Sequence, residues 1–167
     1  MPATSEINTP SRAGEAIQVP IAAATLIYAG TLVALDADGR AVPAADTAGL
    51  RVIGRAEATV DNSTGAAGAL SIDIQRGVFR FANSTGSAVV AATVGKIAFV
   101  EDNQTVALAS THSVKAGRVI AVTDAGVFVD TTEAQDVPSA DTITGAADLA
   151  ALKVAVLAIL QAQGLVK

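Results

Sequence analysis

The sequence predicts a mainly β protein: a small β-barrel, tulip-like or sandwich domain with an extended N-terminal arm and one C-terminal α-helix. Between residues 16 and 131, short runs rich in Val, Ile, Leu and Thr alternate with turns that contain Asp, Asn, Ser and Gly. This spacing is typical of all-β sandwiches and barrels. Residues 145–163 are instead a continuous run of strong helix formers. Residues 1–15 show neither pattern.

The composition limits the classes of function. The chain has 167 residues, which suits one domain with an appendage. Hydrophobic residues make up 51% but aromatic residues only 3%, so we expect a core of small aliphatic side chains. Without Cys, neither disulfides nor thiolate metal sites can form. The net charge is −5 and the Lys and Arg residues are scattered, which argues against direct binding of nucleic acid.

Residues 1–15 are polar, contain two prolines and have no hydrophobic periodicity. They are either a disordered tail or a flexible arm that becomes ordered on a partner by adding a strand. They lack the basic segment and apolar core of a signal peptide. The uncharged run 19–35 is interrupted by Pro20 and Gly30, so we expect strands there and no membrane partner.

Two stretches of the β region resemble each other. AGTLVALDADGRAVPA (29–44) and VGKIAFVEDNQTVALA (94–109) each have a Gly before an apolar run, an acidic turn and a second apolar run. A Val-Ile pair follows each stretch, at 52–53 and 119–120. The pattern favours two duplicated hairpin halves, although any two amphipathic hairpins share some of it. Neither stretch contains an obvious catalytic residue.

The region between these stretches is framed by two copies of Asn-Ser-Thr-Gly, at 62–65 and 83–86. The copies match the glycosylation acceptor pattern, but turn formation explains them better. Within the frame, apolar and polar residues alternate from Leu70 to Gln75, which predicts a half-buried strand. Gly77 then predicts a bulge or a turn.

The end of the β region is followed by a linker over residues 132–144, which contains Pro138. The helix expected over residues 145–163 ends before Gly164, a natural C-cap. Apolar residues recur in it at spacings of three and four, as in a coiled-coil seam. These predicted seam residues are Leu149, Leu152, Val156 and Ile159. The helix could pack on its own domain, between subunits, or both.

No motif indicates catalysis, so we expect a protein that is not an enzyme and has no cofactor. The one histidine, His112, lies in a predicted loop, and no Gly-x-Ser-x-Gly elbow is present. The sequence of Asp36–Gly39 resembles the start of a calcium loop, but the later ligands do not follow, which favours a hairpin turn. Glu101 and Asp102 are adjacent in a turn and do not form an acid–base pair.

The stretch VPIAAATLIYAGTLVALDADGRAVPA, followed by an Ala-Gly-x-x-Val-Ile-Gly run at 48–54, resembles the head decoration, or cement, proteins of tailed bacteriophages. Those proteins commonly have a Val-Pro segment, an Ala-Gly before a strand, a Gly hairpin and an Ala-Val-Pro-Ala return. The matching positions here are Val19-Pro20, Ala29-Gly30, Gly39 and Ala41–Ala44. The resemblance covers about residues 18–130, and the C-terminal helix is not a constant feature of the family.

The resemblance implies a homotrimer that binds the major capsid protein on the capsid exterior and stabilises the mature shell. The protein would be part of the virion, and in the host cytoplasm before assembly. The residues we expect to contact the capsid are Ile7 and the segment Ile17 to Val19, and the seam residues would mediate self-association. Two alternatives remain: a tail or head-fibre component, and a non-catalytic carbohydrate-binding or adhesion module.

Overall fold

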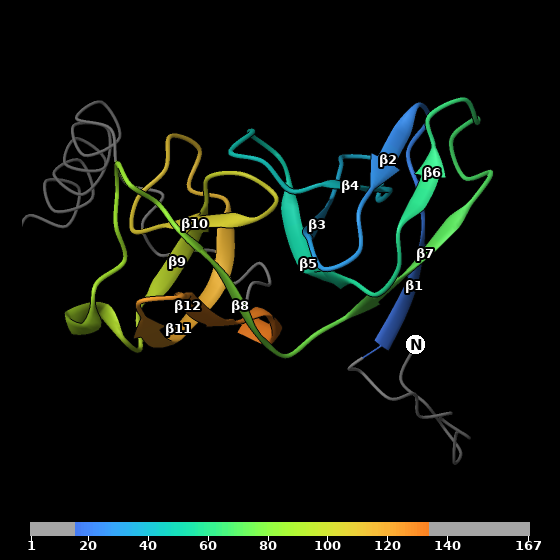
Figure 1. The fold of residues 1–167 in the computed structure, drawn as a ribbon. Coiled ribbons are helices and arrows are strands. Elements are labelled where there is room, and N and C mark those ends of the chain that lie inside the picture. The colour runs from blue at the N-terminus through green and yellow to red at the C-terminus, as the bar shows by residue number, and fades with distance from the viewer. Residues whose placement is uncertain (1–15, 134–167) are drawn as a thin grey trace, which may run out of the picture. The chain divides into compact units, whose positions relative to one another are not determined.

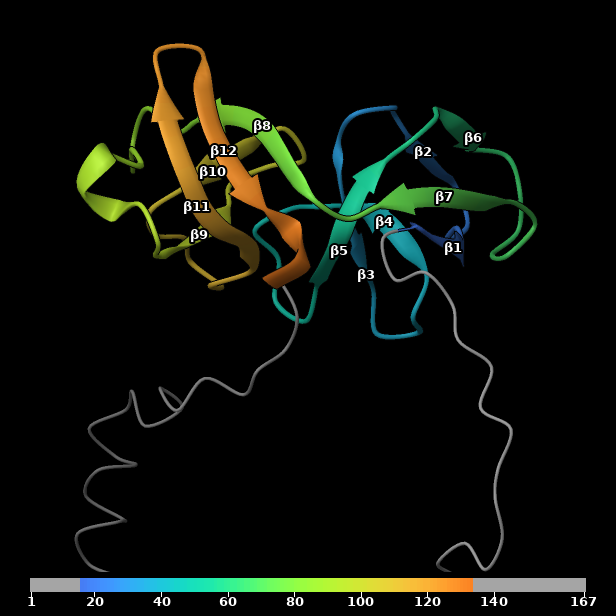
Figure 2. The same ribbon diagram turned by 90° about the horizontal axis from the view of Figure 1, so that it is seen from below.

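The computed structural model describes residues 16–133, which form a mainly β structure (Figures 1 and 2). The predicted arm, most of the linker and the predicted helix lie outside the described residues. The elements are β1 (Ala16–Pro20), β2 (Thr25–Ile27), β3 (Leu32–Leu35), β4 (Ala41–Pro43), β5 (Arg51–Ala56), β6 (Val60–Asn62), β7 (Ser71–Gln75), β8 (Val78–Asn83), η1 (Ala91–Thr93), β9 (Ile97–Val100), β10 (Thr105–Ala107), β11 (Lys115–Thr123), β12 (Gly126–Asp130) and η2 (Thr131–Glu133).

Ten of these strands form two five-stranded sheets. The first has the order β1-β7-β5-β3-β4, and its ends meet at a parallel bridge between Ile21 and Ala41. The second is a closed barrel of β8, β12, β11, β9 and β10, which the parallel pairing of β8 with β10 completes. Of the two, the second is fully closed, whereas the first is a curled sheet whose edges meet at that single bridge; for brevity we call them the first barrel and the second barrel. The prediction of a β-barrel is therefore confirmed.

The two barrels have the same strand order and the same connecting hydrogen bonds. Strands β1, β7, β5, β3 and β4 correspond in turn to β8, β12, β11, β9 and β10. In the first barrel, the Gly30 N–H donates to the Ala56 carbonyl (2.8 Å), and in the second the Gly95 N–H donates to the Val119 carbonyl (2.8 Å). In the same way, the bond from Ala22 N–H to the Ala41 carbonyl (3.1 Å) matches the bond from Ser84 N–H to the Val106 carbonyl (2.9 Å). The similar stretches 29–44 and 94–109 contain the corresponding hairpins β3–β4 and β9–β10.

The two Val-Ile pairs, however, are not at corresponding positions. Val52 pairs with Ala34 on β3. On β9 the counterpart of Ala34 is Phe99, and its partner is Lys115. The pair at 52–53 thus corresponds to 115–116, and the pair at 119–120 lies four residues further along. A better marker of the repeat is the Gly-Arg pair, at 54–55 and 117–118, where both strand pairs lose register.

Small aliphatic side chains fill both barrels, as the composition predicts. The buried residues occupy corresponding positions: Val33 and Ala98, Ala41 and Val106, Ile53 and Ala116, Ala56 and Val119, Ile72 and Val127, and Ile74 and Val129. Burying each Val or Ile contributes about 1.5–3 kcal/mol. The half-buried strand predicted after Leu70 is confirmed as β7, although Leu70 itself is 42% exposed.

The opposite side of β3 and β5 packs on the second barrel. Leu32, Ala34 and Val52 are at most 2% exposed and belong to the core cluster of the second barrel. We call them the β3 outer face. The Leu32 N–H donates a 2.7 Å hydrogen bond to the Asn103 carbonyl in the β9–β10 hairpin. In the contact between them, the first barrel therefore contributes a sheet face, and the second contributes core side chains and the tip of the β9–β10 hairpin.

Candidate interaction surfaces

β1 contains two of the residues predicted to contact the capsid. Ile17 and Val19 are half-buried, and their side chains pack against the core of the first barrel. The exposed residues of β1 are Ala16, Gln18 and Pro20, and the Gln18 amide donates to the Asp73 carboxylate on β7 (3.0 Å). A partner that binds β1 would meet these residues, or the backbone at its edge of the sheet.

The remaining predicted contacts cannot be placed. Ile7 and the seam residues Leu149, Leu152, Val156 and Ile159 lie outside the described residues. Both assignments therefore stay predictions.

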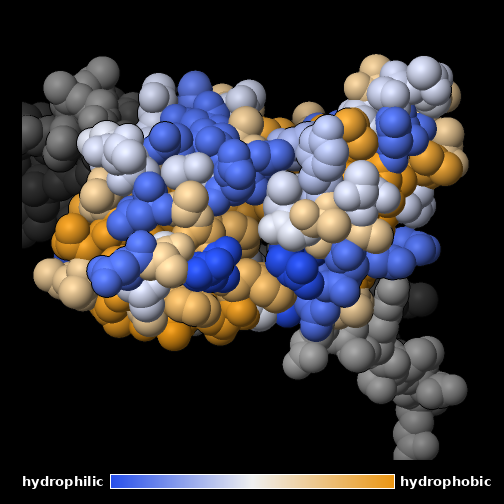
Figure 3. All heavy atoms as spheres, viewed as in Figure 1, coloured by the Kyte–Doolittle hydropathy of each residue, from blue (hydrophilic) through white to orange (hydrophobic). Residues whose placement is uncertain are grey.

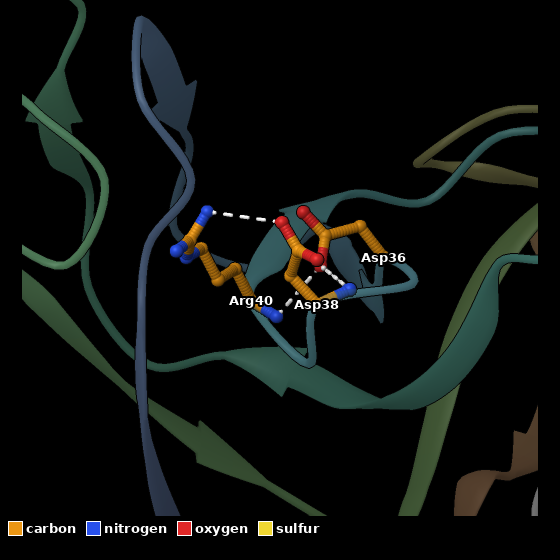
Figure 4. A network of polar contacts seen from close by, with 3 residues as sticks. All are labelled: Asp36, Asp38 and Arg40. Atoms are coloured by element: carbon orange, nitrogen blue, oxygen red, sulfur yellow. Dashed lines mark hydrogen bonds and ion pairs between the residues drawn. The ribbon is translucent and has the colours of Figure 1, made fainter.

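The β3–β4 hairpin ends in an exposed acidic tip (Figure 4). The Asp36 carboxylate accepts hydrogen bonds from the backbone N–H groups of Asp38 (2.9 Å) and Arg40 (2.8 Å). Arg40 also forms a 3.2 Å ion pair with Asp38, whose side chain is 69% exposed. Exposed pairs of this kind contribute only about 0–1 kcal/mol. Asp36 thus shapes the turn with its side chain, which supports the hairpin interpretation over a calcium loop.

The β9–β10 hairpin has a similar acidic tip, formed by Glu101 and Asp102. The Asp102 carboxylate accepts 2.8 Å hydrogen bonds from the N–H groups of Gln104 and Thr105. The next residue, Asn103, makes the backbone bond to the β3 outer face. In both tips an aspartate carboxylate accepts backbone hydrogen bonds from the turn. Within one chain, however, it is the β9–β10 tip that bonds the backbone of Leu32.

A third contact joins the loops that follow β4 and β10. The Asp46 carboxylate accepts hydrogen bonds from the backbone N–H groups of Thr111 (2.7 Å) and His112 (2.8 Å). The His112 Nδ1–H donates to the Asp46 carbonyl oxygen (2.8 Å). Burial raises the pKa of Asp46, but its hydrogen bonds, chiefly those from the backbone N–H groups of His112 and Thr111, and the nearby His112 side chain together lower the pKa below its ordinary value. His112 is therefore part of a contact between loops.

Both Asn-Ser-Thr-Gly segments start with an asparagine that bonds its own loop. The Asn62 amide donates to the carbonyls of Ala22 (2.8 Å) and Ala66 (3.0 Å). The Asn83 side chain bonds both the N–H and the carbonyl of Val89, each at 2.8 Å. These bonds hold the loops against the barrels, as the turn interpretation predicts. Asn62 is buried, so its amide is not accessible to a glycosylating enzyme.

An exposed apolar patch lies beside η1 on the second barrel. It consists of Val90 (47% exposed), Val94 (49%) and Ile120 (43%), and we call it the η1 patch. The hydrogen bond from Gly95 N to Val119 O holds the end of the η1 loop beside β11. Figure 3 shows hydrophobic residues on the second barrel near the place of η1 and β11 in Figure 1. Exposed apolar patches often mark binding surfaces.

The described residues contain no group of three or more His, Asp or Glu residues that could hold a metal ion. No helix within the described range is long and apolar enough to cross a membrane. In comparisons with known proteins, no family model, curated protein or solved structure matches the chain.

The surfaces formed by the repeat are not apparent from the sequence before the two barrels are aligned. The Gly-Arg pairs at 54–55 and 117–118 could have aligned the two barrels correctly. That alignment would have shown that Val52, an apolar residue of the first barrel, corresponds to Lys115 in the second.

Proposed function

We propose that this protein is a structural component of a bacteriophage virion that binds the capsid exterior as a homotrimer and stabilises the mature shell. Its partners would be the major capsid protein and other copies of the chain. It would lie on the outside of the virion, with a tulip-like β domain of the kind found in head decoration proteins.

The observation that carries the proposal is the resemblance of about residues 18–130 to decoration proteins, whose motif positions lie between Val19 and Gly54. In the structure, these motif positions lie in or next to β1, the β3–β4 hairpin and β5 of the first barrel. The described residues thus form a repeated β scaffold with exposed apolar and acidic surfaces. A protein that binds the assembled shell and not its separate subunits stabilises the shell by linkage, by about 2.7 kcal/mol per site at a concentration one hundred times its Kd.

The alternatives receive less support. A carbohydrate-binding module commonly stacks sugars on exposed aromatic side chains. All five aromatic residues are described, and of these Tyr28 is the one classed as exposed, at 56%. A single ring does not make a platform. A tail or head-fibre component differs from a decoration protein in where it lies on the virion, which the experiment below measures.

The test is binding to empty shells assembled from the major capsid protein of the phage that would carry this chain. We expect the full chain to co-sediment with shells in multiples of three copies and to raise the temperature at which shells break. A variant beginning at residue 16 is expected to bind at least about tenfold more weakly, since tethered contacts add avidity. Electron microscopy of labelled virions would show label spread over the head.

The proposal would be wrong if the chain failed to bind shells, or if the label lay only at the tail or at one vertex. Ile7→Asp isolates the predicted arm contact, and Asn8→Asp is its matched control. Equal binding of the two variants would exclude Ile7 as a capsid contact.

A further inference from the structure

We propose that the outer face of β9 and β11 on the second barrel binds the β3–β4 hairpin tip of the first barrel in a second copy of this chain. The contact would repeat between chains the arrangement that joins the two barrels within one chain. The inference deepens the self-association part of the proposed function and rests on it for the number of copies.

The argument starts from the correspondence of the two barrels. The β3 outer face consists of Leu32, Ala34 and Val52. The strand pairing places Ile97, Phe99 and Lys115 at the same positions of the second barrel. We call these three residues the β9 outer face. Ile97 and Phe99 do not belong to either core cluster, as expected for side chains outside the barrel.

The two faces differ in how much they are covered. In the first barrel Leu32 and Ala34 are fully buried because the second barrel packs on them. In the second barrel Ile97 and Phe99 are only half-buried. The η1 patch shares strand β11 with this surface, because its residue Ile120 is exposed on β11, two residues after Arg118, the strand partner of Ile97. An apolar surface of this kind is a candidate interface.

The occupant follows from the contact made within the chain. Asn103 at the tip of β9–β10 bonds Leu32. The residue that corresponds to Asn103 is Asp38, at the tip of β3–β4, and the residue that corresponds to Leu32 is Ile97. The Asp38 tip is exposed in this chain. It is therefore a ready partner for the β9 outer face of another copy.

The charges of the two surfaces also suit each other. The β3–β4 tip carries two carboxylates, Asp36 and Asp38, against one cation, Arg40, whereas the β9 outer face carries Lys115 and has Arg118 beside it. In the first barrel the counterpart of Lys115 is the apolar Val52, which is buried. A lysine there suits a contact between chains better than a core, because its aliphatic stem can cover apolar surface while its charged end stays at the polar rim of an interface.

A contact of this type is head-to-tail, since each copy contributes a different surface. Head-to-tail contacts give rings when the rotation closes and filaments when it does not. A closed ring of three copies would contain six barrels, in which first barrels and second barrels alternate around the ring.

The absence of cysteine from the chain allows a direct test. We would prepare Asp38→Cys and Ile97→Cys as separate proteins, mix them and oxidise, in solution and on shells. We expect a disulfide-linked dimer from the mixture, on the order of tenfold more than from a control mixture of Ser63→Cys with Ile97→Cys, because bound surfaces raise the effective concentration. Ser63 is an exposed loop residue of the first barrel.

Equal cross-linking in the two mixtures, or dimers formed mainly from one variant alone, would overturn the proposal. Phe99→Asp provides a second measurement: we expect a lower native mass than for Val78→Asp, which changes an exposed residue of β8. An unchanged mass would also count against the β9 outer face. Shell binding without the cross-link would overturn this interface and leave the capsid role intact. A cross-link without shell binding would support this interface and overturn the capsid role.

Discussion

At the scale of single residues, Asp46 joins the loops of the two barrels. Its carboxylate accepts two backbone hydrogen bonds from the loop after β10, and its own carbonyl accepts one from His112. Hydrogen bonds to an ionised acceptor are stronger than bonds between neutral groups. Because these bonds favour the charged carboxylate, they lower the pKa of Asp46 below 3.8 and couple its ionisation to folding.

We expect Asp46→Asn to lower the free energy of unfolding by about 1–2 kcal/mol at neutral pH, since an amide can accept only one of the two backbone bonds. The folded-state pKa is lowered, so the stabilisation is present above pH 3.8 and is lost as the pH falls through the folded value. The difference between wild type and variant should therefore shrink in acid. Urea unfolding at several pH values measures it, with Asp124→Asn in the exposed β11–β12 turn as the control. A difference independent of pH would contradict this role of the Asp46 charge.

At the scale of strands, the bulges in β5 and β11 require glycine. Gly54 and Gly117 lie where the register shifts, with φ of 148° and 145°. A Cβ at Gly54 would be 2.5 Å from the Gln75 carbonyl oxygen, and one at Gly117 would be 2.1 Å from that of Asp130. The corresponding backbones therefore approach each other closely in both barrels.

Replacing either glycine by alanine should destabilise the protein. We expect Gly54→Ala and Gly117→Ala each to cost about 3 kcal/mol, from the unfavourable φ and the contact with backbone. Gly86→Ala is the matched control, because no atom lies within 4 Å of its Cβ position and its φ is not in the left-handed region. Thermal unfolding would show the difference. If the Gly54→Ala and Gly117→Ala variants were as stable as Gly86→Ala, the backbones would not approach each other closely at these two positions.

The sequence predicted the strands better than their arrangement. Alternation identifies β7 because Ile72 and Ile74 face the core, and side chains in a strand alternate between its faces. The second barrel closes through the pairing of β8 with β10, and the edges of the first sheet meet at Ile21 and Ala41. These contacts join residues distant in the chain and leave no local pattern. The candidate site was less predictable, since Lys115 at an apolar position of the repeat has meaning only after the barrels are aligned.

At the scale of the whole described structure, the first barrel completes the core of the second. The β3 outer face lies in the second barrel's core cluster, and the Arg55 guanidinium lies 4.6 Å from the centre of the Phe79 ring on β8. Damage to the first barrel should therefore reach the second, and the two should unfold together.

Leu32→Ala tests this coupling. We expect a loss of about 2–5 kcal/mol, the usual cost of removing a buried leucine side chain, and one common transition in denaturant. Two engineered fluorescent probes, one on each barrel, should report the same midpoint. Val78→Ala, at a position 48% exposed, is the control and should change stability by less than about 0.5 kcal/mol. Separate midpoints for the two barrels would show that the shared core does not couple them.

The oligomeric state of a shortened chain can show whether self-association depends on the β9 outer face or on the predicted seam over residues 145–163. We expect a chain that ends at Asp141 to form the same oligomer as the full chain, but at higher concentration, because the head-to-tail contact remains while any seam contacts are lost. Native mass spectrometry over a dilution series measures this, and Leu152→Asp with Val156→Asp in the full chain should match the truncation. If the shortened chain were monomeric at every concentration and gave no Asp38→Cys to Ile97→Cys cross-link, self-association would belong to the C-terminal segment. A shortened chain that cross-links as well as the full chain would assign it to the barrels.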